Sequence, residues 1–251
     1  MVFIDTHCHI DMMKNIDGIV ERAITKDVKI ILNNGVDIKS NRKTLELAEK
    51  YKEVKSVLGI YPIDALKMSD EEIEKEIEFI RENKEKIIGI GEVGIDLKWS
   101  KDLEKQKPIF EKFIDLAKEL DKPLIVHSRE AEEKVMNILK AKKAKKVVIH
   151  CFNGELRFVN EAIERGWFFS IPANICFSEN FQKLVEKLPL ENILCETDSP
   201  YLHPIKGERN NEPGNVIESY KKIAKIKGLK LEEVEKNIEN NFKKIFGLQL
   251  I

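Results

Sequence analysis

Eight short apolar runs, separated by longer amphipathic segments, follow one another along the chain and restrict the folds open to it. Each run is rich in Ile and Val and reads as continuously apolar rather than alternating, which is typical of parallel strands buried on both faces. The eight runs are Val2–Asp5, Lys29–Asn33, Val54–Gly59, Ile87–Gly91, Pro123–His127, Lys146–His150, Trp167–Ile171 and Ile193–Glu196.

The segments between the runs carry apolar residues at helical spacing on a charged background. Strands alternating with helices predict right-handed strand–helix–strand units and a parallel sheet. Eight such units in 251 residues predict an α/β, single-domain (β/α)8 TIM-like barrel over residues 1–251, with an open doubly wound sheet as the alternative. The expected helices are 15–26, 38–51, 69–84, 101–120, 129–141, 154–165, 178–187, 214–227 and 231–246.

Polar residues at the ends of several runs favour the barrel, because a barrel collects its active site from the C-terminal ends of many strands. The five histidines show this pattern. Four of them end or follow apolar runs, and the fifth follows an acidic cluster near the eighth run; they are His7, His9, His127, His150 and His203. Neutral imidazole is the commonest metal ligand, so we expect one shared polar site at that end of the sheet.

The first run ends in a His-x-His pair. Alternate side chains of a strand share a face, so Asp5, His7 and His9 are expected to point the same way. Two imidazoles spaced in this way can bind one cation, whereas a lone histidine is more often a hydrogen-bonded core residue.

Carboxylates follow the fourth and eighth runs. Glu92 lies between glycines, where backbone approaches a ligand closely, and is able to bridge two cations. Glu196 and Asp198 share a face after the eighth run. Asp198 either ligates a metal, takes a proton from water, or does both, while Glu196 is expected to support its neighbours through a salt bridge.

Four histidines and two carboxylates suit one or two divalent ions with open positions for water and substrate. Such ions lower the pKa of bound water toward ~7, and hydrolysis is the reaction expected. No Gly-rich phosphate loop and no Ser or Cys nucleophile with its own base is present. The expected ligands are His7, His9, Glu92, His127, His150 and Asp198.

The chain resembles the TatD-like metal-dependent deoxyribonucleases, a branch of the amidohydrolase superfamily, along its whole length. The resemblance implies one metal held by His7, His9, Glu92 and Asp198, a second held by Glu92, His127 and His150, and Asp198 as general base. It rests on Asp5-Thr6-His7-Cys8-His9, Gly91-Glu92-Val93-Gly94-Ile95-Asp96, Val126-His127-Ser128-Arg129-Glu130-Ala131, His150-Cys151-Phe152-Asn153-Gly154, Glu196-Thr197-Asp198-Ser199-Pro200-Tyr201-Leu202 and Asn211-Glu212-Pro213.

Three positions depart from the pattern of this family. Tyr61 stands where the family commonly has histidine, and it can donate a hydrogen bond but cannot take up a proton near pH 7. Leu97-Lys98-Trp99 follows the Glu92 motif, where the family usually has an aromatic residue directly. His203 replaces a small or aliphatic residue. The expected substrate contacts are Tyr61, Arg129, His203, Lys206 and Arg209.

The leading hypothesis is a deoxyribonuclease with two divalent ions (Mg, Mn, Zn or Co), acting in the 3′–5′ direction on single strands or 3′ ends of DNA. The alternatives are hydrolysis of a carbon-centred ester or amide, such as D-aminoacyl-tRNA or a lactone, and a non-catalytic metal-binding protein. A net charge of −1 predicts no tight binding of bulk nucleic acid or anionic membrane.

The expected compartment is the cytoplasm. Four cysteines without CxxC spacing predict reduced thiols, and no apolar stretch reaches the ~18 residues of a membrane span. A strand-like run beginning at Val2 argues against a signal peptide. The sequence fixes no oligomeric state, and a monomer is compatible with it.

Overall fold

The computed structural model describes residues 1–248, and its internal contacts divide the chain into two compact units. Unit 1 comprises Met1–Asn33, Leu47–Lys55 and Phe168–Ile251, and unit 2 comprises Asn34–Glu46 and Ser56–Trp167. The prediction of one domain over residues 1–251 stays a prediction, and residues 249–251 lie outside the described part of the chain.

Unit 1 contains the two ends of the sheet and the C-terminal helices. Its elements are β1 (Phe3–Cys8), α1 (Ile16–Thr25), most of β2 (Val28–Asn34), β7 (Phe168–Pro172), α8 (Glu179–Lys187), β8 (Ile193–Glu196), α9 (Val216–Lys227) and α10 (Leu231–Phe246). Helices α9 and α10 both pack against β1 and β8. Tyr220 of α9 anchors this packing, because its ring meets Phe3 edge-on at 5.0 Å and its hydroxyl accepts from Ile4 N at 3.1 Å.

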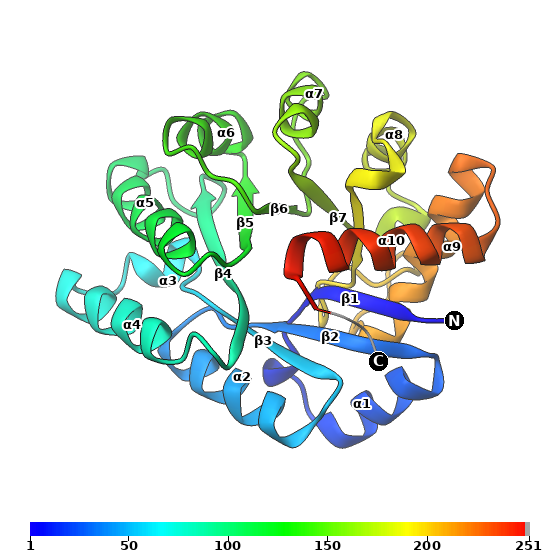
Figure 1. Cartoon of the computed structure of the whole chain (residues 1–251), viewed down its shortest axis with the longest axis horizontal. Coiled ribbons are helices and arrows are strands. Elements are labelled where there is room, and N and C mark those ends of the chain that lie inside the picture. The colour runs from blue at the N-terminus through cyan, green and yellow to red at the C-terminus, as the bar shows by residue number, and fades with distance from the viewer. Residues whose placement is uncertain (249–251) are drawn as a thin grey trace. The chain divides into compact units, whose positions relative to one another are not determined.

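Unit 2 contains the middle of the sheet. Its elements are α3 (Pro62–Ala65), α4 (Asp70–Glu82), β4 (Ile87–Asp96), α5 (Leu103–Glu119), β5 (Leu124–Arg129), α6 (Glu132–Ala141), β6 (Val147–His150) and α7 (Arg157–Glu164), while α2 (Ile38–Lys50) and β3 (Val54–Leu58) have residues in both units. Figure 1 shows β4 and β5 beside each other, and α5 packs on β4 as α6 packs on β5. Phe110 and Phe113 of α5 are fully buried there.

The strands follow one another in chain order from β1 to β8, and each defined pair is parallel. Within unit 1 the eighth strand returns to the first, where Cys8 bridges Ser199 just after β8. Parallel strands in chain order, alternating with helices and with the last beside the first, define the (β/α)8 class. The predicted fold class is therefore confirmed.

The helices begin and end where the side chains dictate. Ser69 caps α4 by accepting from Glu72 N, while Glu72 accepts from Ser69 N in a reciprocal capping box. Gly228 and Gly247 end α9 and α10 in the left-handed conformation that suits glycine. No helix in residues 1–248 combines the length and the apolar character that crossing a membrane requires.

Three boundary predictions are wrong. Strand β1 runs past Asp5 to Cys8, and β4 runs past Gly91 to Asp96, so His7 and Glu92 lie inside strands. Residues 129–131, expected in a helix, instead finish β5 and turn, with Glu130 at φ 54°. The short helix α3 was not predicted, although Pro62 at its first position is typical of a helix start.

Candidate metal centre

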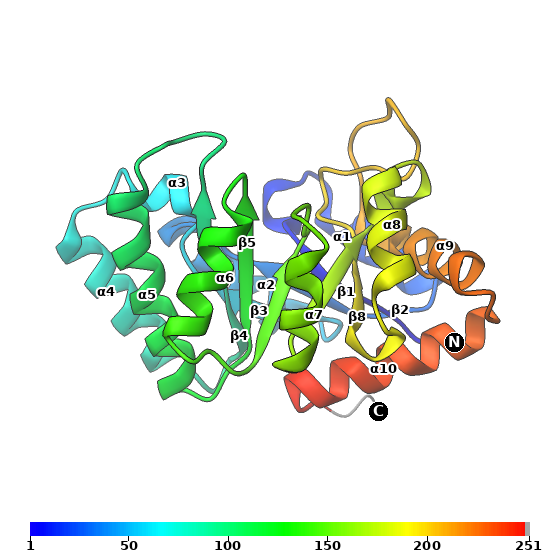
Figure 2. The same cartoon turned by 90° about the horizontal axis from the view of Figure 1, so that it is seen from above.

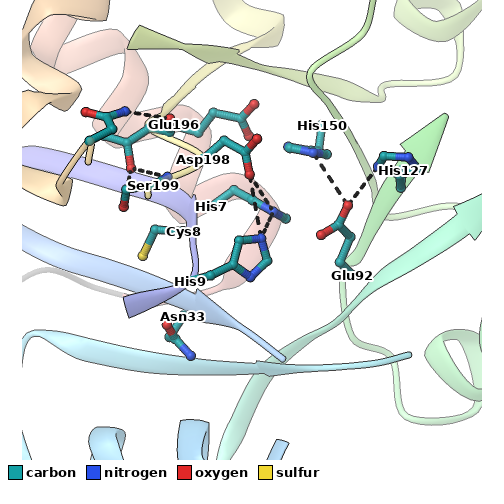
Figure 3. A network of polar contacts seen from close by, with 12 residues as sticks. His7, Cys8, His9, Asn33, Glu92, His127, His150, Glu196, Asp198 and Ser199 are labelled. Carbon is teal, nitrogen blue, oxygen red and sulfur yellow. Dashed lines mark hydrogen bonds and ion pairs between the residues drawn. The ribbon is translucent and has the colours of Figure 1, made fainter. Parts of the chain in front are cut away.

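Within unit 1, the His-x-His pair at the end of β1 lies next to the aspartate that follows β8. His7 Nε2 and His9 Nε2 lie 3.2 Å apart, and Asp198 Oδ1 lies 3.7 Å from the first and 3.6 Å from the second (Figure 3). Both imidazoles are buried, whereas the Asp198 side chain is 17% exposed. One end of this group therefore faces solvent, and all three polar atoms converge on one point.

The spacing of these three atoms fits a bound cation. Ligand atoms at ~2.1 Å from a tetrahedral divalent ion lie about 3.4 Å from one another. The three observed separations, 3.2, 3.6 and 3.7 Å, fall around this value. Two imidazoles and a carboxylate are also a ligand set that zinc, manganese and cobalt accept. The residues present therefore fit a divalent metal.

Backbone hydrogen bonds hold this group together. Asp198 N donates to His7 O at 2.9 Å, and His9 N donates to Ser199 O at 2.7 Å. Asp198 itself has φ 52°, a left-handed conformation that costs a non-glycine residue about 1–3 kcal/mol and occurs mostly at functional sites. The turn after β8 is thus fixed to β1, and it presents the aspartate to the two histidines.

Asp5 supports the same turn, and we did not predict this role. Its carboxylate accepts from Thr197 N at 2.9 Å and from Thr197 Oγ1 at 2.6 Å. Burial raises the pKa of Asp5, and the hydrogen bonds from Thr197 and His7 oppose that rise. Its position two residues before His7, on the same face, was the available signal. Glu196, the expected supporting acid, is buried and accepts from Ser170 Oγ.

Within unit 2, three neighbouring strands each contribute one ligand atom to a second group. Glu92 of β4 has Oε1 at 2.8 Å from His127 Nδ1 of β5 and at 3.6 Å from His150 Nε2 of β6 (Figure 3). The two imidazole rings lie 5.9 Å apart between centroids. All three side chains have at most 12% exposure, and the most exposed of them is an imidazole, His127, rather than the carboxylate.

The contact between His127 and Glu92 has the distance but not the angle of a hydrogen bond. His127 Nε2 lies 3.0 Å from Asp96 Oδ2 and donates its proton there. In the neutral imidazole the other ring nitrogen then carries a lone pair. A ring nitrogen and a carboxylate oxygen that lie close together without pointing at each other can both be ligands of one cation, so this group also fits a divalent metal.

Asp96 orients His127, and we did not predict this role either. Its Oδ2 also accepts from the Tyr61 hydroxyl at 2.6 Å, and its Oδ1 accepts from Lys98 N and Trp99 N. Burial raises the pKa of Asp96, but the hydrogen bonds from His127, Tyr61 and the backbone outweigh burial and hold that pKa at about 2. Carboxylates that hold a metal-binding histidine in this way fix its tautomer and its ring orientation.

Burial and neighbouring acids also shift the pKa values of His127 and Tyr61, the two side chains that donate to Asp96. Burial lowers the pKa of His127, but Asp96 and Glu92 raise it more strongly, so the net shift is upward. Burial and the hydrogen bond to Asp96 raise the pKa of Tyr61. Tyr61 therefore stays a hydrogen-bond donor, and its hydroxyl is directed at Asp96.

Two glycines allow β5 to approach β4 at this group. A Cβ on Gly94 would lie 2.0 Å from His127 O, and one on Gly91 would lie 2.8 Å from Ile125 O. Both glycines have φ near +150°, a region that side chains disfavour. The glycine-flanked sequence around Glu92 is therefore needed to bring His127 alongside it.

The expected substrate contacts fall in both units. Tyr61 and Arg129 lie in unit 2, where Arg129 is the exposed last residue of β5. The other three lie in unit 1, in the segment between β8 and α9, where His203 Nδ1 accepts from Ile205 N at 3.1 Å and Lys206 and Arg209 are exposed. Their contact with substrate stays a prediction, as does the prediction that Glu92 bridges two ions.

Comparisons with known proteins agree across almost the whole chain. The family described as TatD related DNase matches residues 4–247. An uncharacterized metal-dependent hydrolase of Methanocaldococcus jannaschii is 41% identical, over 99% of this chain and 98% of its own. The human protein named deoxyribonuclease TATDN3 is 34% identical, over 97% of this chain and 94% of its own. The crystal structure of YJJV, a TatD homologue of Escherichia coli, has a TM-score of 0.90 at 27% identity and covers 98% of each chain.

Proposed function

The chain belongs to the TatD related DNase family, and from this premise we propose that it hydrolyses phosphodiester bonds of DNA. It is a metal-dependent hydrolase of that family. The finer reaction is our proposal: removal of nucleotides in the 3′–5′ direction, from single strands or from 3′ ends. The observation that carries it is a pair of histidine–carboxylate groups, each with the spacing of a divalent-ion site, in a chain of a DNase family.

We propose that each group holds one divalent ion. His7, His9 and Asp198 would hold the first, and Glu92, His127 and His150 the second. When bound, such ions lower the pKa of a water ligand and neutralise charge on phosphoryl oxygens. The imidazole-rich ligand sets favour Zn, Mn or Co over Mg, which prefers oxygen ligands.

Asp198 is the proposed general base. Its carboxylate is the most exposed of the candidate ligand side chains, and its left-handed backbone places Oδ1 beside both imidazoles. A carboxylate held there accepts a proton from the attacking water while the neighbouring imidazoles keep its orientation. Glu92 is proposed as the bridging ligand that the resemblance implies, so its catalytic role is to hold and orient rather than to move a proton.

The basic side chains are proposed to bind the phosphates of the strand. Arg129 lies two residues beyond His127 on the same strand, and a guanidinium makes paired hydrogen bonds to phosphate oxygens. Lys206, Arg209 and His203 are proposed to contact the strand from the segment after β8. The hydrogen bond of Tyr61 to Asp96 supports a positioning role for Tyr61, through Asp96, on His127.

The proposal is tested by turnover after metal-free protein is reloaded separately with Mg, Mn, Zn or Co. The substrates are single-stranded DNA labelled at its 3′ end, a D-aminoacyl-tRNA and a simple lactone. His150→Ala is the matched control, because it removes one ligand of the second group. We expect metal-dependent loss of 3′ nucleotides from the wild type and none from the control.

Hydrolysis of the aminoacyl ester or the lactone with intact DNA would contradict the nuclease proposal. This outcome would not affect the family membership or the proposed metal groups, but it would assign the chain to hydrolysis of carbon-centred esters. Loss of DNA that persists in the control, or that needs no metal, would indicate a contaminating nuclease.

A further inference from the structure

One large aromatic side chain beside the second metal group is exposed. Trp99 exposes 66% of its surface, whereas Trp167, the other tryptophan of the chain, is fully buried. An isolated exposed apolar residue is ordinary, but a tryptophan held in place beside a polar site is not. Trp99 belongs to the segment between β4 and α5, which extends beyond the carboxyl end of β4 in Figure 2.

The backbone of Trp99 is tied to the metal group through Asp96. Trp99 N donates to Asp96 Oδ1 at 2.9 Å, and Asp96 also holds His127 at 3.0 Å. Asp96 and Arg129 are register partners across β4 and β5. The backbone that carries the indole is therefore fixed to the strand end that carries His127.

Arg129 covers part of the indole. Its guanidinium carbon lies 5.7 Å from the centroid of the Trp99 ring, within the range of a cation–π contact. Such a contact contributes about 0.5–1 kcal/mol at an exposed site, so it favours one orientation of the ring. With 66% of the residue still exposed, much of the ring remains open to a ligand.

The charges around the indole are mainly positive. Lys98 and Lys101 both pair with Glu130, at 3.2 and 3.1 Å, and Arg129 stands beside them. With the Asp96 carboxylate that accepts from Trp99 N included, three cations face two carboxylates, so this rim keeps a positive balance although the whole chain has a net charge of −1. The rim therefore favours an anionic ligand that also has flat apolar groups.

Resting on the proposed function, we infer that Trp99 is a stacking platform for an unpaired base of the bound strand, with Arg129 beside it for a phosphate. Stacking of a base on an aromatic ring is tolerant of sequence, because each base has a π-face, and a positively charged groove that follows the backbone usually accompanies it. A base held in a duplex offers no free face. The platform thus selects strands with unpaired bases, whether DNA or RNA, and it does not read their sequence.

Arg129 lies two residues past His127, about 7 Å along a strand. The platform is therefore close to the second metal group, and it positions the strand without taking part in the chemistry. Trp99 is a specificity-determining residue in this account.

The fluorescence of Trp99 gives a test that does not depend on turnover. The full chain carrying Asp198→Asn, loaded with metal, is titrated with a short single-stranded DNA, with the same length of RNA, and with a strand of abasic sites. We expect the base-bearing strands to quench the fluorescence, and Trp99→Phe to remove the quenching because Trp167 is buried.

Variant affinities then separate stacking from general apolar contact. In the same background, Trp99→Leu is expected to weaken binding of base-bearing strands by about tenfold or more and to leave abasic strands unaffected. Trp99→Phe keeps an aromatic ring and is expected to retain most of the affinity. Quenching by either DNA or RNA supports the platform and identifies the strand it accepts.

Equal binding of base-bearing and abasic strands, or unchanged affinity in Trp99→Leu, would overturn the inference. Failure of the proposed function looks different: the wild type would turn over no DNA with any metal, whatever the binding data show. The two outcomes are therefore read from separate measurements.

Discussion

The two ligand groups are built and supported differently. In unit 1, His7 lies in β1 and His9 follows the end of that strand, and backbone hydrogen bonds fix the turn that carries Asp198. In unit 2, three strands each supply one side chain, and Asp96 orients His127. The most exposed side chain is a carboxylate, Asp198 at 17%, in the first group and an imidazole, His127 at 12%, in the second.

This difference indicates that the two groups contribute to hydrolysis in different ways. An exposed carboxylate beside two imidazoles is suited to exchange a proton with water. A group whose carboxylate is buried, and whose histidine is held by an acid of pKa about 2, is suited to hold an ion in one geometry. We therefore expect substitutions at the first group to lower mainly kcat, and substitutions at the second group to lower mainly metal affinity.

The largest effect is expected for Asp198→Asn. The amide keeps the shape of the side chain but cannot accept the proton, so kcat should fall by about 10²–10⁴-fold. The measurement is steady-state turnover of labelled DNA, with metal content determined on the same samples. A loss of metal in proportion to the loss of kcat would mean that Asp198 acts only as a ligand.

Asp96→Asn should act on the ion of the second group. The asparagine oxygen is expected to keep the bonds from Lys98 N and Trp99 N, so an NH2 group would face His127 in place of the acceptor that fixes its tautomer. Metal affinity at that group should fall about 10–100-fold. Titration of metal-free protein with Zn or Mn measures this, with Asp102→Asn as control, since Asp102 caps α5 and pairs with Lys105. If the dissociation constants of both metal ions were the same in Asp96→Asn as in the wild type, Asp96 would not support a metal ligand.

Thr197→Val tests the support of the first group. Valine matches threonine in shape but removes the hydroxyl that donates to the buried Asp5 carboxylate at 2.6 Å. The free energy of unfolding should decrease by about 1–3 kcal/mol, the cost of leaving a buried acceptor with one donor fewer. Urea denaturation measures it; an unchanged midpoint would contradict the role given to Asp5.

Tyr61→Phe should have the smallest effect. It removes one of the donors to Asp96, while His127 and two backbone amides remain. We expect a several-fold loss of metal affinity at the second group and an unchanged KM for DNA. A large rise in KM with intact metal affinity would instead place Tyr61 in contact with substrate.

Periodicity and length predicted the α/β class, and the polar residues at the strand ends favoured the barrel over an open sheet. Continuous Ile- and Val-rich runs separated by amphipathic segments predicted each strand and nine of the helices. A strand buried on both faces is apolar throughout, whereas a helix buried on one face has apolar residues only at helical spacing. The ends were less accurate where glycines interrupt β4. Gly91 reads as a strand end, whereas the close approach of β5 requires it within the strand.

The sequence could name the candidate ligands but not their supports. His-x-His and the Asp198 cluster stand out because their residue types and spacing point to metals. The position of Asp5 on the same face as His7 was a signal of its place but not of its role. The roles of Asp5 and Asp96 could not be predicted, since their partners Thr197 and His127 lie 192 and 31 positions away and only the fold brings them together. The exposure of Trp99 is likewise a property of the folded chain.

The most direct test of two separate metal groups is the metal content of the wild type, His9→Ala and His127→Ala, measured by elemental analysis after dialysis against trace metal. Each variant removes one ligand from one group only. We expect two ions per chain in the wild type and one in each variant. A single ion in the wild type, or two ions retained in both variants, would contradict it.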